Sequence, residues 1–155
     1  SDFNSLAKAS SNKPLYALHL FETGTLAQET EFIGKFLELT RGDMSLRSMV
    51  DLIGDIGAAT AIGFLAKFFN RSTKFLLLAD LKQGMSPEEN EFVALCRISN
   101  SPLKNTVLIL ITFYDELIIA QRQLLDTNLN AELIVESLVW EWSKLNSRII
   151  GDTTR

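Results

Sequence analysis

The sequence has only one cysteine, one histidine and three prolines. A lone Cys96 cannot form an internal disulfide, and its apolar neighbours predict a buried thiol rather than a reactive one. Metal and acid–base sites usually need several converging histidines, cysteines or carboxylates, and His19 has no second histidine to join. The composition therefore predicts a reducing, cytoplasmic location, with no metal and no cofactor.

Positive charge is also scarce, because 15 lysines and arginines stand against 19 acidic residues. No run of basic residues could neutralise a phosphate backbone, so we expect no nucleic-acid partner. No stretch of about 20 uncharged apolar residues occurs, so we expect no transmembrane segment. Glycine-rich nucleotide loops and the serine elbow of hydrolases are absent as well. These absences predict a protein that is not an enzyme and has no catalytic residues.

The sequence does contain clear helix-capping signals. Ser86-Pro87 and Ser101-Pro102 each match the cap and the first position of a helix. Caps and apolar spacing predict helices at 15–22, 25–41 with Thr25 as cap, 45 to about 69, 73–81 with Thr73 as cap, 86–99, 102–126 and 131–150. We expect an all-α, single-domain bundle of about six or seven helices over 1–155, with 1–13 as a loosely docked arm.

The segment 107–114 is ambiguous, because its eight residues are β-branched, aromatic or leucine and could form a buried parallel strand. Over 102–126, however, most polar residues fall in one stripe of a helical wheel, which favours a helix. The alternative is an α/β fold with short parallel strands at 75–81 and 107–114. An enzyme of that kind would carry Asp80 and Asp115 after its strands, where ligands commonly bind.

Small residues mark the helix predicted at 45–70. Beyond Gly57 the polar side of this helix becomes apolar too, so the helix either sinks into the core or breaks there. Small side chains let a neighbouring helix approach closely, or leave a groove for an apolar ligand or a partner helix. The residues that would line such a groove are Gly54, Gly57, Ala61, Phe64 and Phe68.

The clearest interaction signal lies in the helix predicted at 131–150. Trp140 and Trp142 are two residues apart and must point in nearly opposite directions on a helix. A helical wheel assigns Trp142 to the core and places Trp140 with Leu133 on an otherwise polar face. Such a pair resembles an interface anchor, because tryptophan is enriched among residues that dominate binding energy. Alternatively, a second layer of the same domain, such as the N-terminal arm, covers it.

We therefore expect a regulatory, adaptor or self-assembling module that binds a protein partner through Leu133, Glu136, Trp140 and Lys144. A homo-oligomer, and first of all a homodimer, is the simplest form, because a twofold axis lets one patch serve both chains. The alternative is a helical protein that binds a small ligand or lipid in an apolar cavity beside the glycine-rich helix.

Overall fold

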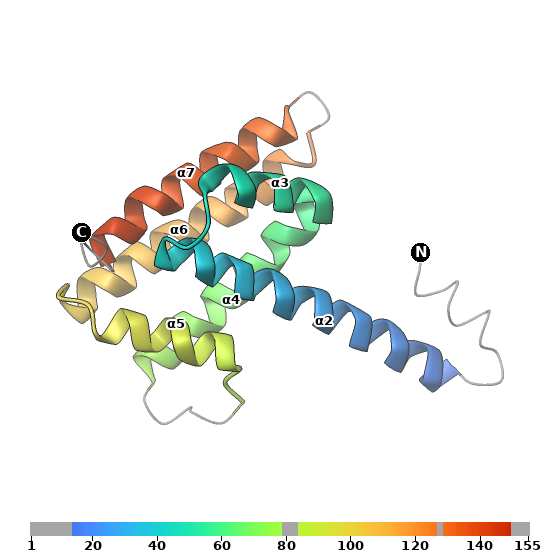
Figure 1. Cartoon of the computed structure of the whole chain (residues 1–155), viewed down its shortest axis with the longest axis horizontal. Helices are drawn as coiled ribbons and strands as arrows, with labels where there is room; N and C mark the ends of the chain where they lie inside the picture. The colour runs from blue at the N-terminus through green and yellow to red at the C-terminus, as the bar shows by residue number, and fades with distance from the viewer. Residues whose placement is uncertain (1–13, 79–83, 127–128, 150–155) are drawn as a thin grey trace. The chain divides into compact units, whose positions relative to one another are not determined.

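A computed structural model describes residues 14–78, 84–126 and 129–149, with side chains described from residue 24 onward. No strand occurs in these ranges, which confirms the predicted all-α class (Figure 1). The six described helices are α2 (Pro14–Arg41), α3 (Leu46–Ile56), α4 (Ala58–Leu77), α5 (Pro87–Arg97), α6 (Leu103–Gln123) and α7 (Ala131–Ile149).

The α/β alternative is wrong, because 107–114 lies wholly within α6 and the described start of 75–81 belongs to α4. The chain divides into two units, Ser1–Phe32 and Ile33–Arg155, and the packing described below is that of the second unit. The predicted arm at 1–13 and the predicted site residue Asp80 lie outside the described residues. A single domain over the whole chain stays a prediction.

Three predicted helix starts are wrong. Thr25 lies inside α2, which continues without a break through it. Thr73 lies inside α4, where its hydroxyl donates a hydrogen bond of 2.7 Å to the carbonyl of Phe69. Helix α6 begins one residue late, with Pro102 rather than Ser101 as its N-cap. A threonine is tolerated within a helix when its hydroxyl bonds a carbonyl of the preceding turn. The presence of a threonine therefore does not by itself identify the start of a helix.

Gly57 breaks the helix predicted at 45–70 into α3 and α4, whose axes are bent by 111°. Its φ of 108° and ψ of 125° are readily reached only by a residue without a Cβ atom. After the break, α4 runs through the core. Both outcomes expected for the helix predicted at 45–70, a break and burial in the core, therefore occur. The large buried residues of α4 are Ile62, Leu65, Phe68, Phe69, Phe75 and Leu76.

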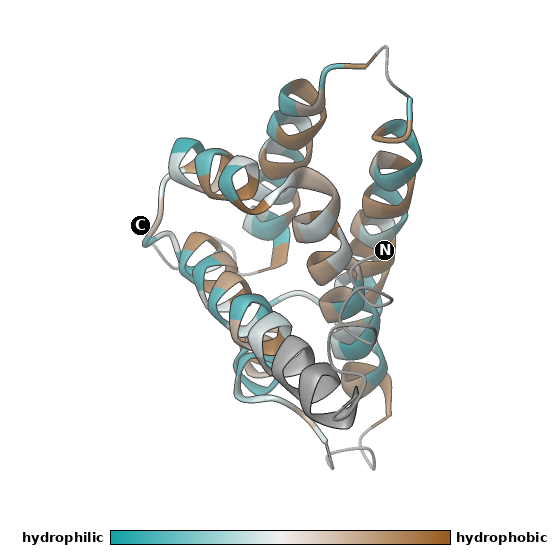
Figure 2. Cartoon of the chain, turned by 90° about the vertical axis from the view of Figure 1, so that its right-hand side faces the viewer, coloured by the Kyte–Doolittle hydropathy of each residue, from teal (hydrophilic) through white to brown (hydrophobic). Residues whose placement is uncertain are grey.

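The core of the second unit is centred on aromatic rings from five helices. Trp142 on α7 lies 5.0 Å from Phe69, 5.1 Å from Phe113 and 5.5 Å from Phe36, measured between ring centroids. Such contacts stabilise beyond the apolar area that they bury, by about 0.5–1.5 kcal/mol per pair. Figure 2 shows the helices striped along their length, apolar on one side and polar on the other.

We predict opposite effects of alanine at two glycines. Gly57→Ala should lower the free energy of unfolding by about 1–3 kcal/mol, because a Cβ atom strains this backbone conformation. The nearest atom, Thr60 Oγ1, lies 4.0 Å from the Cβ position, so strain rather than a clash is the cause. Gly54→Ala is the control: it lies within α3, has nothing within 4 Å, and should raise stability by about 0.5–1 kcal/mol. Urea denaturation followed by circular dichroism measures both, and equal effects would contradict the prediction.

Candidate protein-interaction surface

Helix α7 presents opposite faces to the core and to solvent. Trp142 is 1% exposed, and its indole N–H donates a hydrogen bond of 3.1 Å to the Thr40 hydroxyl. Thr40 in turn donates to the carbonyl of Phe36 at 3.0 Å, so the indole is fixed by a chain of hydrogen bonds. Trp140 is 59% exposed. The predicted opposition of the two indoles is therefore confirmed.

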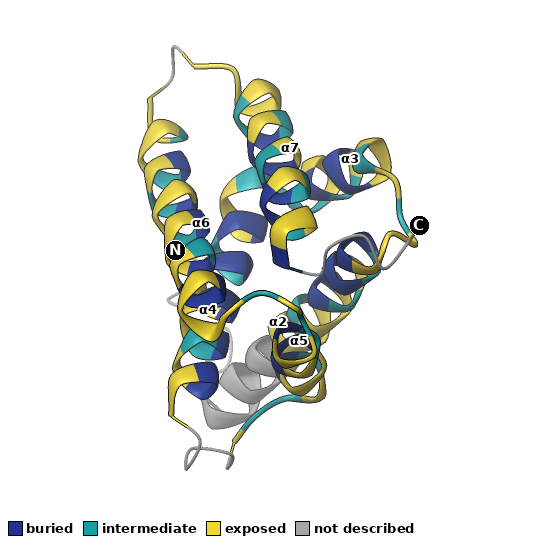
Figure 3. Ribbon diagram, turned by 90° about the vertical axis from the view of Figure 1, so that its left-hand side faces the viewer, coloured by how far each residue is buried: buried dark blue, intermediate teal, exposed yellow. Residues whose placement is uncertain are grey.

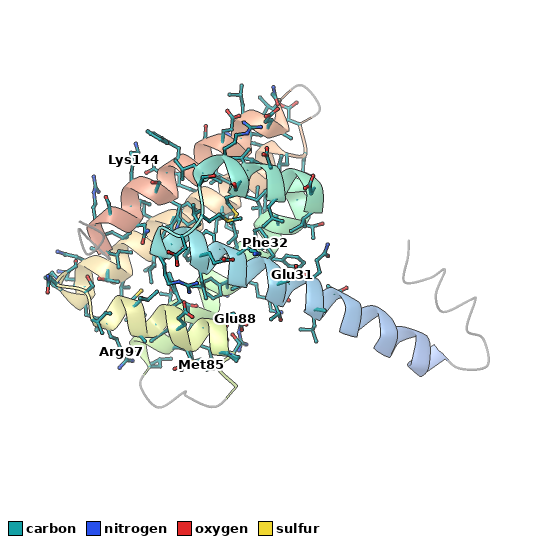
Figure 4. All side chains as sticks on the ribbon, in the orientation of Figure 1. Glu31, Phe32, Met85, Glu88, Arg97 and Lys144 are labelled. Carbon is teal, nitrogen blue, oxygen red and sulfur yellow. The ribbon has the colours of Figure 1, made fainter. Side chains whose placement is uncertain are left out.

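The exposed face of α7 carries the four residues predicted to bind a partner. Leu133 is 60% exposed and lies seven residues before Trp140, so both occupy the same side of the helix. Glu136 lies between them, and Lys144 follows on the outer side of α7 (Figure 4). Figure 3 shows both exposed and buried residues along α7. We name Leu133, Glu136, Trp140 and Lys144 the α7 stripe; its binding role stays a prediction.

Acidic residues surround the amino-terminal half of the α7 stripe. Arg47 on α3 approaches Glu132 at 3.2 Å and Glu136 at 3.3 Å, and it also pairs with Asp51 at 2.9 Å. These contacts raise the pKa of Arg47, with the hydrogen bond to Glu132 as the largest cause. All these groups are solvent-exposed, so the pairs orient side chains more than they stabilise the fold. One arginine is shared among three carboxylates.

Basic residues occupy the carboxyl-terminal half of α7. Lys144 has an exposed side chain and pairs with Glu141 one turn earlier at 3.4 Å. Arg148 lies in the last turn of the helix, where a positive charge interacts favourably with the helix dipole. The outer face of α7 is therefore acidic near its start and basic near its end, with Trp140 between the two.

The residues predicted to form an apolar groove differ in burial and in their place on α3 and α4. Ala61 and Phe68 are buried in the core, Phe64 is half-buried on α4, and Gly57 forms the turn before that helix. Gly54 lines a cleft between α3 and the start of α7. Its volume is about 590 Å³, and its lining includes Arg47, Asp51, Asp55 and Glu132. Charged groups around this cleft do not suit a lipid, so it lends the lipid-binding alternative no support.

Chemically reactive groups do not converge in the described part of the chain. No group of three or more histidine, cysteine or acidic side chains could hold a metal ion among these residues. Cys96 is buried, and burial raises the pKa of its thiol to about 12, which keeps it protonated at neutral pH. Asp115 is exposed on α6 and follows no strand. His19 lies in α2, and its side chain is outside the described ones.

Within the described ranges, no single helix combines the length and apolar character needed to cross a membrane. By length and composition alone, the bent pair of α3 and α4 passes such a test when its two members are taken together. Comparisons of the chain with family models, curated proteins and solved structures find no match. Function is therefore inferred from the residues themselves.

A partly buried ion pair joins α4 to α5. Arg71 Nε lies 2.6 Å from Glu89 Oε2, and Arg71 Nη2 lies 3.2 Å from Glu89 Oε1 and 2.7 Å from the carbonyl oxygen of Gly84. Ser86 caps α5 as predicted: its hydroxyl accepts from the Glu89 amide at 3.0 Å, and its own amide donates to Glu89 Oε1 at 2.9 Å. Sequence spacing did not reveal the ion pair, because its partners are 18 residues apart on different helices.

Burial alone would raise the pKa of Glu89, but hydrogen bonds from Arg71 and Ser86 and the charge of Arg71 outweigh it. The pKa of Glu89 consequently lies below its ordinary value of 4.5. Because the folded pKa is below the unfolded one, this stabilisation is complete above the unfolded pKa and is lost as pH falls through the folded pKa. The pair fastens α5 to α4 and is structural.

We predict that Arg71→Met lowers the free energy of unfolding by about 2–3 kcal/mol near neutral pH, because it leaves a buried carboxylate without its cation. Glu89→Gln should cost less, about 1 kcal/mol, since Arg71 remains accessible to water. The difference between Arg71→Met and the wild type should shrink as pH falls below 4.5, because protonation of Glu89 removes the charge that Arg71 neutralises. Urea titrations from about pH 7 to about pH 3 measure this difference in the free energy of unfolding, and a difference that stays constant would refute the assignment.

Proposed function

We propose that this chain is a non-enzymatic protein–protein interaction module, of regulatory, adaptor or self-assembling type, that binds another polypeptide through the α7 stripe. Its simplest partner is a second copy of the chain. The observation that carries the proposal is the exposure of Trp140 (59%) and Leu133 (60%) on one face of a helix whose opposite face is packed in the core. Large apolar side chains that share one helix face in a polar field are typical of interface anchors.

The energetic argument rests on water removal from these two side chains. Complete burial of a large apolar side chain contributes about 1.5–3 kcal/mol, and an indole adds favourable aromatic contacts. The helix that carries them is already held in place: Trp142 bonds Thr40, and Asn146 Nδ2 donates to the Thr40 carbonyl at 2.9 Å. A rigid surface loses little conformational entropy on binding, which favours association.

The size of the surface sets the expected affinity. Helix α7 has 19 residues and is therefore about 28 Å long. One face of such a helix buries less than the roughly 800 Å² per partner of a standard interface. We therefore expect a reversible complex with a dissociation constant in the micromolar range, as suits a regulatory contact.

We predict that Trp140→Asp weakens self-association at least about tenfold, because a charge replaces the aromatic anchor. The matched control is Leu108→Asp, which introduces the same charge at a position on α6 that is 53% exposed. Sedimentation velocity over a range from about 1 µM to several hundred µM measures the association, and circular dichroism checks the fold. A wild type that stays monomeric throughout, or equal effects of the two variants, would refute self-association through this face.

A further inference from the structure

We infer that two copies of the chain pair through their α7 stripes in antiparallel orientation, with Trp140 of each copy at the twofold axis. This inference rests on the proposed function and adds to it the orientation and register of the partner helix. The observation behind it is the order of charges along the exposed face of α7. Glu132 and Glu136 precede Trp140, whereas Lys144 and Arg148 follow it.

The spacing of these charges is symmetric about Trp140. Glu136 lies four residues before Trp140, and Lys144 lies four residues after it. In an antiparallel pair centred on Trp140, residues at equal distances from the centre lie at the same height. Glu136 of one copy therefore lies opposite Lys144 of the other, and the twofold axis creates this pair twice.

A second, outer pair follows the same rule. Glu132 and Arg148 lie eight residues to either side of Trp140, so they too reach the same height in the antiparallel arrangement. A parallel pair in register would instead bring glutamate next to glutamate and lysine next to lysine. Opposite charges across the contact stabilise one orientation, and like charges across it destabilise the other.

Contacts within one chain do not prevent this pairing. Glu136 is engaged by Arg47 through one carboxylate oxygen at 3.3 Å, and its side chain remains 42% exposed. Lys144 is held by Glu141 at 3.4 Å, with 60% of its side chain exposed. Ion pairs this accessible are worth about 0–1 kcal/mol, so the side chains can turn to a partner at little cost. The carboxylate of Glu136 can also accept bonds from both cations at once.

The test is a charge exchange between two variants. Glu136→Lys alone places lysine opposite lysine at both symmetry-related contacts, and Lys144→Glu alone places glutamate opposite glutamate at both. Each variant should therefore self-associate about tenfold more weakly than the wild type at low salt. A 1:1 mixture should recover association through mixed dimers, because each of the two contacts in such a dimer joins a lysine of one chain to a glutamate of the other.

 

These opposite-charge contacts form in a mixed dimer in either register, so the mixture tests the position of the contact and not its orientation. Recovery in the mixture therefore shows that positions 136 and 144 both lie in the contact. The orientation is decided by the single variants, because only the antiparallel register makes them weaker than the wild type. Carrying both changes on one chain should restore self-association. The control, Lys104→Glu on α6, alters the net charge by as much as Lys144→Glu and should have no effect.

The outcomes separate this inference from the function that it refines. If Trp140→Asp disrupts association but the single charge variants associate as tightly as the wild type, the antiparallel register is wrong and the α7 stripe remains the binding surface. If Trp140→Asp has no effect, both the proposed surface and the register fail. When one of the two charge variants in the mixture is labelled, sedimentation velocity distinguishes mixed dimers from dimers of a single variant.

Discussion

The burial of the Trp142 indole is the constraint on which the exposed surface depends. Its ring lies among Phe36, Phe69 and Phe113, and its N–H bonds the Thr40 hydroxyl, so α7 can neither rotate nor slide without leaving a buried polar group unpaired. A residue two positions away on a helix turns by about 200°, which forces Trp140 outward. Exposure of that second indole is thus a consequence of the core and of the order of residues in α7.

Periodicity predicted the parts of this fold that depend on one helix at a time. The polar stripe over 102–126 correctly predicted a helix where eight apolar residues resembled a strand, and the wheel of α7 correctly separated Trp140 from Trp142. Both predictions are correct because burial of one side of a helix requires apolar residues at a regular helical spacing in the sequence. The predicted helix start at Ser86 is also confirmed, because serine followed by proline and two glutamates is typical of the first turn of a helix.

Features that depend on contacts between helices could not be predicted in this way. Thr25 and Thr73 matched caps in isolation, yet both lie within helices, since context decides whether a threonine caps or only bonds the preceding turn. The small residues from Gly54 to Ala61 predicted one groove, but the turn at Gly57 sends α3 and α4 in different directions, so these residues face different surroundings. The Arg47 contacts with Glu132 and Glu136 join residues 85 and 89 positions apart and leave no local pattern.

In the proposed dimer, the charges around Trp140 determine the orientation of the two chains more than the affinity between them. Exposed ion pairs contribute little net free energy, so affinity has to come from removing Trp140 and Leu133 from water. The apolar side chains of this helix face would be buried in a parallel pair as well as in an antiparallel one. Apolar contact alone would therefore not favour either orientation. The acidic start and basic end of α7 remove that ambiguity, because only the antiparallel pairing avoids like charges on both sides of the indoles. Because the proposed contact combines an apolar centre with a charged rim, we expect its affinity to fall as the salt concentration rises.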